Sequence, residues 1–407
     1  MESIKEIFRI GNGPSSSHTM GPKKAAELFA KKNPNATHYT VTLYGSLAAT
    51  GKGHLTDVAI LNVLKPIAPT EILWHPEIIL PFHPNGMLFT ACHGDKKMDE
   101  WTIYSVGGGA LANEKITSDS KPIIYDMNTL TEILKWCQKT GRTYWEYVES
   151  KEPADIWEHL REVWHTMKAA VKRGLETEGL LPGNLGVRRK AVEYQIKAMG
   201  YNNNLRSRGL VFAYALACAE ENAAGGRIAT APTCGSSGVL SSVLYHLSKE
   251  YAFAEQRILK ALATAGLIGN IAKKNASISG AEVGCQGEIG VACAMAAAAA
   301  NQLFGGSPSQ IEYAAEMALE HHLGLTCDPV CGLVQIPCIE RNAFAAGRAL
   351  DSNIYATFTD GRHVVSFDKV VAAMKETGKD LPYLYKETSE GGLAVQMLGN
   401  DKELSIN

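Results

Sequence analysis

Residues 290–304 have the sequence GVACAMAAAAANQLF, which predicts a helix that is apolar on almost every face. Residues 210–224, 239–249 and 256–275 predict helices of the same kind. Such helices are buried on all sides, because they present no polar face to the solvent. We therefore expect them to form the centre of a large, mostly helical domain.

Amphipathic helices with clear start and stop signals surround this centre. Asp155 and Glu158 resemble a capping box, and apolar residues at helical spacing follow as far as Gly174. Pro308 opens another such helix, and Gly378 ends the last one. Because the helical pattern begins near residue 130, we assign residues 129–407 to one all-helical domain.

The residues before this domain show a mixed pattern. Alternation of apolar and polar residues at 39–44 predicts a half-buried strand. Asn85-Gly86 predicts a hairpin between strands at 78–82 and 87–91. Further strands are expected at 101–106 and 122–125, and helices at 23–32 and 56–64. The sequence thus predicts an α+β fold, in which a mixed α+β domain of residues 1–128 precedes the larger helical domain.

The composition excludes several classes of protein. Of the 407 residues, 45% are apolar and 20% are charged, so disordered and fibrous proteins are excluded. The 40 Lys and Arg residues nearly balance the 42 Asp and Glu residues, which leaves no basic surface for nucleic acid or an anionic membrane. The N-terminus lacks the apolar segment of a signal peptide, and no apolar run reaches the roughly 20 residues of a membrane span. We therefore expect a cytoplasmic protein.

The 9 cysteines are an odd number, which argues against a secreted disulfide scaffold. Cys285, Cys327 and Cys338 each lie in a loop beside glycine or proline, where backbone amides can point at sulfur. No Cys-x-x-Cys pair is present, so a zinc finger is disfavoured, and an iron–sulfur cluster suits cysteines from separate loops. Three buried structural thiols are the alternative. The cysteines that we interpret as structural are Cys92, Cys137, Cys218 and Cys293.

The number of thiolate ligands decides what such a cluster can do. Cys331 lies close enough in the sequence to complete a set of four, so spacing alone does not choose between three ligands and four. Four thiolates saturate a cluster and suit electron transfer. Three thiolates leave one iron open as a Lewis acid, which a hydro-lyase needs in order to make a hydroxyl a leaving group.

Two loops of the N-terminal part carry hydroxyls and histidines. The first, GPSSSHTMGP at residues 13–22, precedes a predicted helix, so its amides and hydroxyls suit a carboxylate or phosphate and His18 suits a base. Helix capping is the alternative for this serine cluster. The second loop, at residues 45–54, ends in His54, and Asp57 is close enough to fix the orientation of that imidazole. A solvated surface histidine is the alternative there.

Together these motifs resemble the iron–sulfur-dependent L-serine dehydratases, or L-serine ammonia-lyases. The resemblance covers nearly the whole chain, in the order of the family. The matching segments are GPSSSHTMGP (13–22), LYGSLAATGKGH (43–54), YSVGGG (104–109), EGLLPG (178–183), ISGAEVGCQGEIGVA (278–292) and CDPVCGLVQIPCIERN (327–342). The order of the two parts is similar to the β and α subunits of these enzymes joined in one chain.

The resemblance implies a role for each of three groups of residues. Three cysteines would hold a 4Fe-4S cluster with one open iron: Cys285, Cys327 and Cys338. Two histidines would handle the substrate or remove its proton, and which one is the base stays open: His18 and His54. Four hydroxyl-bearing residues would bind the substrate carboxylate: Ser15, Ser16, Ser17 and Thr19.

The implied reaction converts L-serine into pyruvate and ammonia through aminoacrylate, with the β-hydroxyl activated by the open iron. A related lyase acting on L-cysteine or L-threonine is one alternative, and a non-catalytic cluster carrier or iron sensor is another. The expected partner is a small amino acid, with no nucleic acid and no membrane, and the expected assembly is a homodimer.

The chain departs from the pattern of many relatives at three places. Cys234 stands where they have asparagine, and Cys331 stands where they have glycine. Some relatives have a cysteine near the C-terminus that can reach the open iron, whereas residues 401–407 contain none. Cys234 and Cys331 are therefore candidates for an extra thiol near the cluster.

Overall fold

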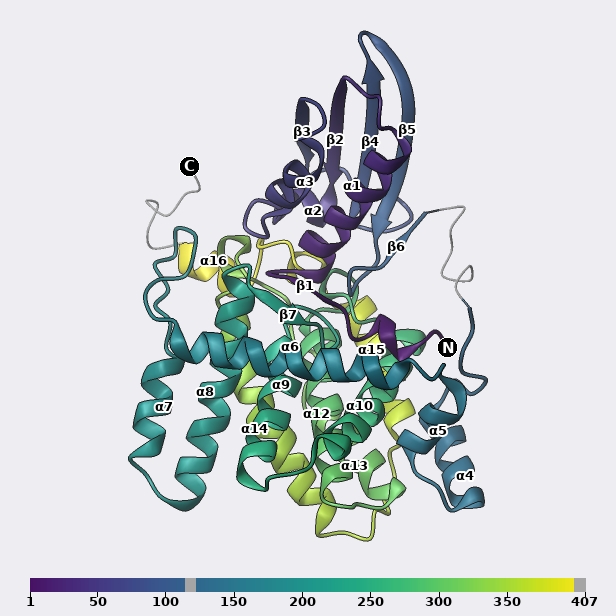
Figure 1. The fold of residues 1–407 in the computed structure, drawn as a ribbon, viewed down its shortest axis with the longest axis vertical. Coiled ribbons are helices and arrows are strands. Elements are labelled where there is room, and N and C mark those ends of the chain that lie inside the picture. The colour runs from purple at the N-terminus through teal and green to yellow at the C-terminus, as the bar shows by residue number, and fades with distance from the viewer. Residues whose placement is uncertain (114–121, 399–407) are drawn as a thin grey trace.

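The computed structural model describes residues 1–113 and 122–398, and it shows a small sheet domain resting on a larger bundle of helices (Figure 1). The expected α+β fold is confirmed, with the sheet part first in the chain and the helical part second. The strand expected at 122–125 is absent, since these residues form no regular element. The backbone N–H groups of Ile124 and Tyr125 instead donate to the Met1 carbonyl.

The sheet domain contains a sheet of five strands in the order β3-β2-β4-β5-β6. Their bounds are β2 (His38–Tyr44), β3 (Thr70–His75), β4 (Gly86–His93), β5 (Lys96–Ser105) and β6 (Leu111–Ala112). Strand β2 pairs in parallel with β3 and antiparallel with β4. The hairpin expected at Asn85-Gly86 is wrong, because Gly86 begins β4 and residues 78–82 form no strand. The tight turn lies between β4 and β5, where Gly94 takes the left-handed conformation with φ 57.

Three helices pack against this sheet, namely α1 (Gly21–Lys32), α2 (Gly45–Ala49) and α3 (Thr56–Leu64). Alternate residues of β2 point into the core between them, and Tyr39, Val41 and Leu43 are completely buried. Phe29 of α1 fills the same core and lies edge-on to Tyr39. The period of two in β2 therefore sets which face of the sheet the helices cover.

The helical domain is built around α12, which is the helix expected at 290–304. The bounds of its helices are α4 (Leu130–Thr140), α5 (Tyr144–Lys151), α6 (Ile156–Glu176), α7 (Ala191–Met199), α8 (Asn203–Ala223), α9 (Ser237–Glu250), α10 (Glu255–Asn275), α11 (Gly280–Val283), α12 (Val291–Leu303), α13 (Pro308–Glu320), α14 (Cys338–Thr357), α15 (Phe367–Asp380) and α16 (Leu393–Leu398). Residues 291–300 are completely buried, and α9, α10, α13 and α14 surround α12 (Figure 1). Small alanine side chains allow this close approach of neighbouring helices on every side.

The first residues of the chain pack with the helical domain. Strand β1 (Ile10–Asn12) pairs antiparallel with β7 (Arg227–Ala229), and Ile4, Ile7 and Phe8 belong to the helical core. The division of the chain into residues 1–128 and 129–407 stays a prediction. In the structure, the first residues of the chain nevertheless pack with the helical domain. None of the described helices is both long enough and apolar enough to cross a lipid bilayer.

Candidate functional site

A small cavity lies between the sheet domain and the helical domain. The sheet domain contributes Pro14, Ser15 and His54 to its wall. The helical part contributes Cys285, Glu288, Cys327, Cys338 and Glu387, together with Gly235, Ile289, Pro329 and Val334. The structure therefore brings the serine loop, one predicted histidine and the three predicted cysteines to one place.

The serine loop forms a single wide turn, η2 (Ser16–Met20), which leads directly into α1. The Ser15 hydroxyl accepts a hydrogen bond from the His18 backbone N–H at 3.1 Å, so this serine does cap the turn. The Thr19 hydroxyl accepts the Ser15 N–H at 3.2 Å and donates to the His54 carbonyl at 2.6 Å. Capping thus accounts for part of the serine cluster, and it also ties this loop to the loop of His54.

The hydrogen bonds around His18 determine where its ring proton lies. The Ser46 hydroxyl donates to the Glu387 carbonyl at 2.9 Å, so it accepts from His18 Nε2 at 3.1 Å. His18 Nδ1 therefore carries the lone pair, and the Ser17 hydroxyl donates to it at 2.9 Å. Both ring nitrogens of His18 are engaged by protein hydroxyls.

The same reasoning gives the opposite tautomer for His54. The Thr50 hydroxyl donates to the Ser46 carbonyl at 3.0 Å, so it accepts from His54 Nδ1 at 2.9 Å. The lone pair of His54 is then on Nε2, and His54 lines the cavity. The expectation that Asp57 orients His54 is wrong, because Thr50 holds His54 Nδ1 and the Asp57 carboxylate accepts the Val58 N–H. The surface alternative is also wrong, since His54 is 1% exposed.

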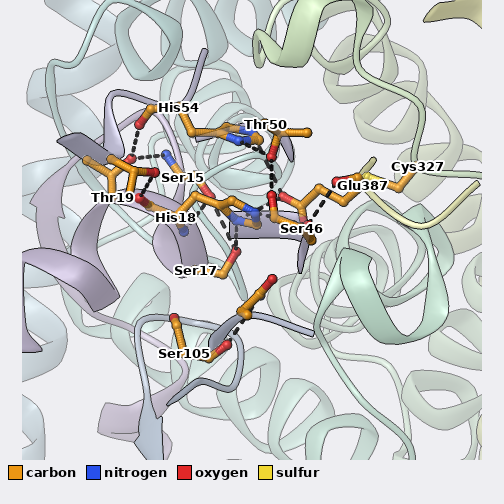
Figure 2. A network of polar contacts seen from close by, with 12 residues as sticks. Ser15, Ser17, His18, Thr19, Ser46, Thr50, His54, Ser105, Cys327 and Glu387 are labelled. Carbon is orange, nitrogen blue, oxygen red and sulfur yellow. Dashed lines mark hydrogen bonds and ion pairs between the residues drawn. The ribbon is translucent and has the colours of Figure 1, made fainter. Parts of the chain in front are cut away.

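The two histidines lie against each other, with ring centroids 4.5 Å apart (Figure 2). Burial lowers the pKa of His54 to about 4, although its contact with Thr50 works in the opposite direction. Burial also lowers the pKa of His18 well below its usual 6.5, and a charge on His54 lowers it further. Both imidazoles are therefore neutral near pH 7.

Glu387 is a member of the site that the sequence analysis missed. Its backbone N–H donates to the Cys327 carbonyl at 2.8 Å, and its φ of 60 turns the side chain toward the histidines (Figure 2). Glu387 Oε1 lies 3.4 Å from His18 Nδ1 and 3.9 Å from His54 Nε2. Burial raises the pKa of this carboxyl well above its usual range, and the charge of Glu288 adds to the effect. The only local signal is the turn-rich sequence KETSEGG at residues 386–392, which does not single out a carboxylate.

Ser46 and Thr50 were also missed. Both belong to the segment that positions His54, and their hydroxyls fix the tautomers of the two histidines. A serine and a threonine on a short helix are ordinary in sequence. Only the direction of their own donated hydrogen bonds reveals this role.

The three predicted cysteines come from separate elements and face the same cavity. The Sγ atoms of Cys285 and Cys327 each lie 3.9 Å from Glu288 Oε2. Cys338 is the first residue of α14 and lines the same cavity. Contact with the Cys285 thiol, together with burial, raises the pKa of Cys327 well above its usual range. All of these cysteines are free.

This donor set fits a cluster that has three protein ligands. The backbone at Gly280 approaches so closely that an added Cβ would lie 2.8 Å from Glu288 Oε2 and 3.1 Å from Cys327 Sγ. A glycine is thus needed to leave room beside the sulfur. Burial lowers the pKa of Arg341, but the three thiols and Asp328 outweigh this and raise it. The Arg341 guanidinium is therefore close enough to the three thiols to balance the charge of thiolates.

Neither candidate for an extra thiol lines the cavity. Cys234 Sγ lies 3.3 Å from Met20 Sδ and contacts the Ser16 side chain, behind the serine loop. Ser16 is therefore the member of the predicted loop whose side chain contacts Cys234. Cys331 is held in the left-handed conformation with φ 53, and its carbonyl lies against Gly53.

Comparison with known proteins places these residues in a family. Residues 91–394 match the serine dehydratase alpha chain, and residues 3–73 and 63–116 match the serine dehydratase beta chain. The chain belongs to the serine dehydratase family. It is an enzyme of that family with the alpha and beta parts in one chain.

Full-length relatives in bacteria support the assignment to the serine dehydratase family. The L-serine dehydratase of Streptomyces coelicolor is 42% identical, over 97% of this chain and 99% of its own length. The L-serine dehydratase TdcG of Escherichia coli is 42% identical, over 98% of this chain and 100% of its own length. The L-serine dehydratase of Haemophilus influenzae is 40% identical over the same shares of the two chains.

Proposed function

We propose that this member of the serine dehydratase family deaminates L-serine to pyruvate and ammonia through aminoacrylate. The observation that carries the proposal is the lone pair of a neutral, buried His54 in the cavity that three free cysteines line. The relatives that are named L-serine dehydratases support the choice of substrate. A protein that only carried a cluster would not need a base beside it.

Cys285, Cys327 and Cys338 are the residues that would hold a 4Fe-4S cluster. When bound, the cluster supplies a Lewis acid for the departing β-hydroxyl. Three ligands agree with the three cysteines that line the cavity, and they leave Cys331 outside the ligand set. The role of the chain itself is then to hold the amino acid and to take its α-proton.

We assign the removal of the α-proton to His54. Its Nε2 has no hydrogen bond within the described chain, while Nδ1 is anchored to Thr50. His18 is less suited to this role, because Ser17 and Ser46 occupy both of its ring nitrogens. The proton would pass from the substrate to Nε2, which lies 3.9 Å from Oε1 of the Glu387 carboxyl group.

The serine loop would bind the substrate carboxylate. Ser15 is the member of the loop that lines the cavity, and Ser17 and Thr19 hold the loop and the histidines in place. Ser16 supports the loop from behind, through its contact with Cys234. Ser15 would thus contact the carboxylate, and Ser16, Ser17 and Thr19 would hold the loop in the position that this contact needs.

An anaerobic assay of cluster-loaded protein tests the proposal. Wild-type protein should release pyruvate from L-serine, and His54→Gln should lose nearly all activity while keeping its iron. Sulfide from L-cysteine or 2-oxobutanoate from L-threonine at a higher kcat/KM would instead favour the related lyases. Bound cluster without any turnover would favour a cluster carrier or sensor. We further propose a cytoplasmic homodimer, which sedimentation and fractionation test.

A further inference from the structure

Glu387 has a carboxylate oxygen for which the site provides no partner. The residue is 5% exposed, and Glu387 Oε2 has no hydrogen-bond partner within the described chain. This oxygen lies 3.3 Å from the position that a Cβ on Gly280 would take, on the side of the cavity where Cys327 lies. A buried carboxyl oxygen without a donor is costly, so this part of the site suits a ligand that donates a hydrogen bond.

The surroundings of Glu387 supply acceptors and no cation. By the tautomers derived above, neither His54 Nε2 nor His18 Nδ1 carries a hydrogen that Glu387 Oε1 could accept, although they lie 3.9 and 3.4 Å from it. Ser17 already occupies the lone pair of His18 Nδ1. Glu288 is a second carboxylate in the cavity wall, and none of the described residues lining the cavity is a lysine or arginine. The missing component is therefore a small cation with several N–H donors.

We propose that Glu387 binds the α-ammonium group of the amino-acid substrate and so makes the enzyme specific for amino acids over other acids. The inference rests on the proposed function and names the residue that recognises the amino group. An ammonium group has three donors, which suit the unpartnered Glu387 Oε2 and the neighbouring acceptors.

This placement also orders the rest of the substrate. An ammonium group at Glu387 puts the α-carbon next to the histidine pair, because Oε1 of the same carboxylate lies 3.9 Å from His54 Nε2. The carboxylate of the substrate then points to the loop of Ser15, and the β-hydroxyl points to the cysteines. A hydrogen in place of the ammonium group would leave Glu387 buried and unpaired, and a hydroxyl would give it one neutral donor in place of three charged ones, which penalises such acids.

The test compares two unreactive ligands on anaerobic, cluster-loaded protein. L-alanine carries the α-ammonium group and 3-hydroxypropionate lacks it. Their dissociation constants are measured by calorimetry for wild type, Glu387→Gln, Glu387→Asp and the control Glu390→Gln, which changes an exposed carboxylate three residues away. Iron content and Tm are recorded for each protein, and KM and kcat for L-serine are measured alongside.

Glu387→Gln should weaken L-alanine binding about 10- to 100-fold, because a hydrogen bond to a charged partner is lost, and should leave 3-hydroxypropionate binding unchanged or stronger. Glu387→Asp should retain part of the L-alanine affinity, and Glu390→Gln should match wild type. KM for L-serine should rise in parallel with the dissociation constant of L-alanine.

Three results would overturn the inference. The first is equal weakening of both ligands by Glu387→Gln, which indicates a purely structural role. The second is a wild-type protein that binds L-alanine no better than 3-hydroxypropionate. The third is a stoichiometric non-iron metal at the His18, His54 and Glu387 side chains, whose ligand atoms lie within 4.8 Å of one another. Because binding is measured without turnover, an absence of pyruvate from L-serine would refute the proposed function separately.

Discussion

Replacing Thr50 by valine tests the chain of hydrogen bonds that sets the tautomer of His54. Valine keeps the shape of threonine but removes the hydroxyl that accepts from His54 Nδ1 at 2.9 Å and donates to the Ser46 carbonyl at 3.0 Å. The Nδ1–H group of a completely buried imidazole is then left without an acceptor. Such a loss costs about 1–3 kcal/mol.

That cost falls on the catalytically competent tautomer. In Thr50→Val the proton moves toward Nε2, where it blocks the lone pair that faces the cavity. We expect kcat for L-serine to fall about 5- to 160-fold, the factor that corresponds to 1–3 kcal/mol, and KM to change by less than about 3-fold. The free energy of unfolding should fall by about 1–3 kcal/mol.

Steady-state kinetics of the anaerobic, cluster-loaded protein measure this effect, with urea unfolding in parallel. Thr140→Val is the matched control, because the Thr140 hydroxyl donates to the Trp136 carbonyl in the same way on an exposed helix. A Thr50→Val enzyme with wild-type kcat would refute the tautomer assignment. A loss of kcat that only follows a loss of iron would place the effect on the cluster instead.

Further substitutions test the ligand set, the buried histidine and the space beside the sulfur. Cys338→Ser should abolish the broad visible absorbance of the cluster and the activity. Cys331→Gly should keep both and should raise the free energy of unfolding in urea by about 1 kcal/mol, since φ 53 suits glycine. Loss of iron in Cys331→Gly would contradict the three-ligand set. Folding lowers the pKa of His54 from 6.5 to about 4, so between these pH values the unfolded chain binds the proton more readily than the folded chain. Acidification from pH 6.5 to 4 should therefore lower the free energy of unfolding of the wild type by up to about 3 kcal/mol more than that of His54→Gln. The same pH dependence of urea unfolding in the two proteins would argue against this. Gly280→Ala should lower the iron content and cost about 1–3 kcal/mol, since the new Cβ would lie 3.1 Å from a sulfur, and full iron loading would show that the wall relaxes.

Local patterns predicted the elements of the helical domain well. The helix expected at 256–275 is α10 (Glu255–Asn275), and the one expected at 239–249 is α9 (Ser237–Glu250). Their apolar faces and end signals lie within one stretch of chain, so pairing with distant residues is not needed to form them. The hairpin at Asn85-Gly86 failed because a turn signal does not say which two strands it joins. Gly94-Asp95, a signal of the same kind, makes the real turn between β4 and β5.

The sequence by itself determined the chemical groups of the site. Cys285, Cys327, Cys338, His18 and His54 stand out because glycine, proline or hydroxyl residues surround them in short motifs. Of these, the structure places the three cysteines and His54 on the wall of the cavity, and it places the ring of His18 against that of His54.

Only the tertiary structure decided how these groups work together. It brought Glu387 from the far end of the chain to the histidines, through a backbone hydrogen bond to Cys327. It also gave His18 and His54 opposite tautomers, because the Ser46 and Thr50 hydroxyls have each already donated their one hydrogen to a backbone carbonyl. Sequence motifs record which groups are present, whereas the direction of a hydrogen bond and the convergence of charges depend on packing between domains.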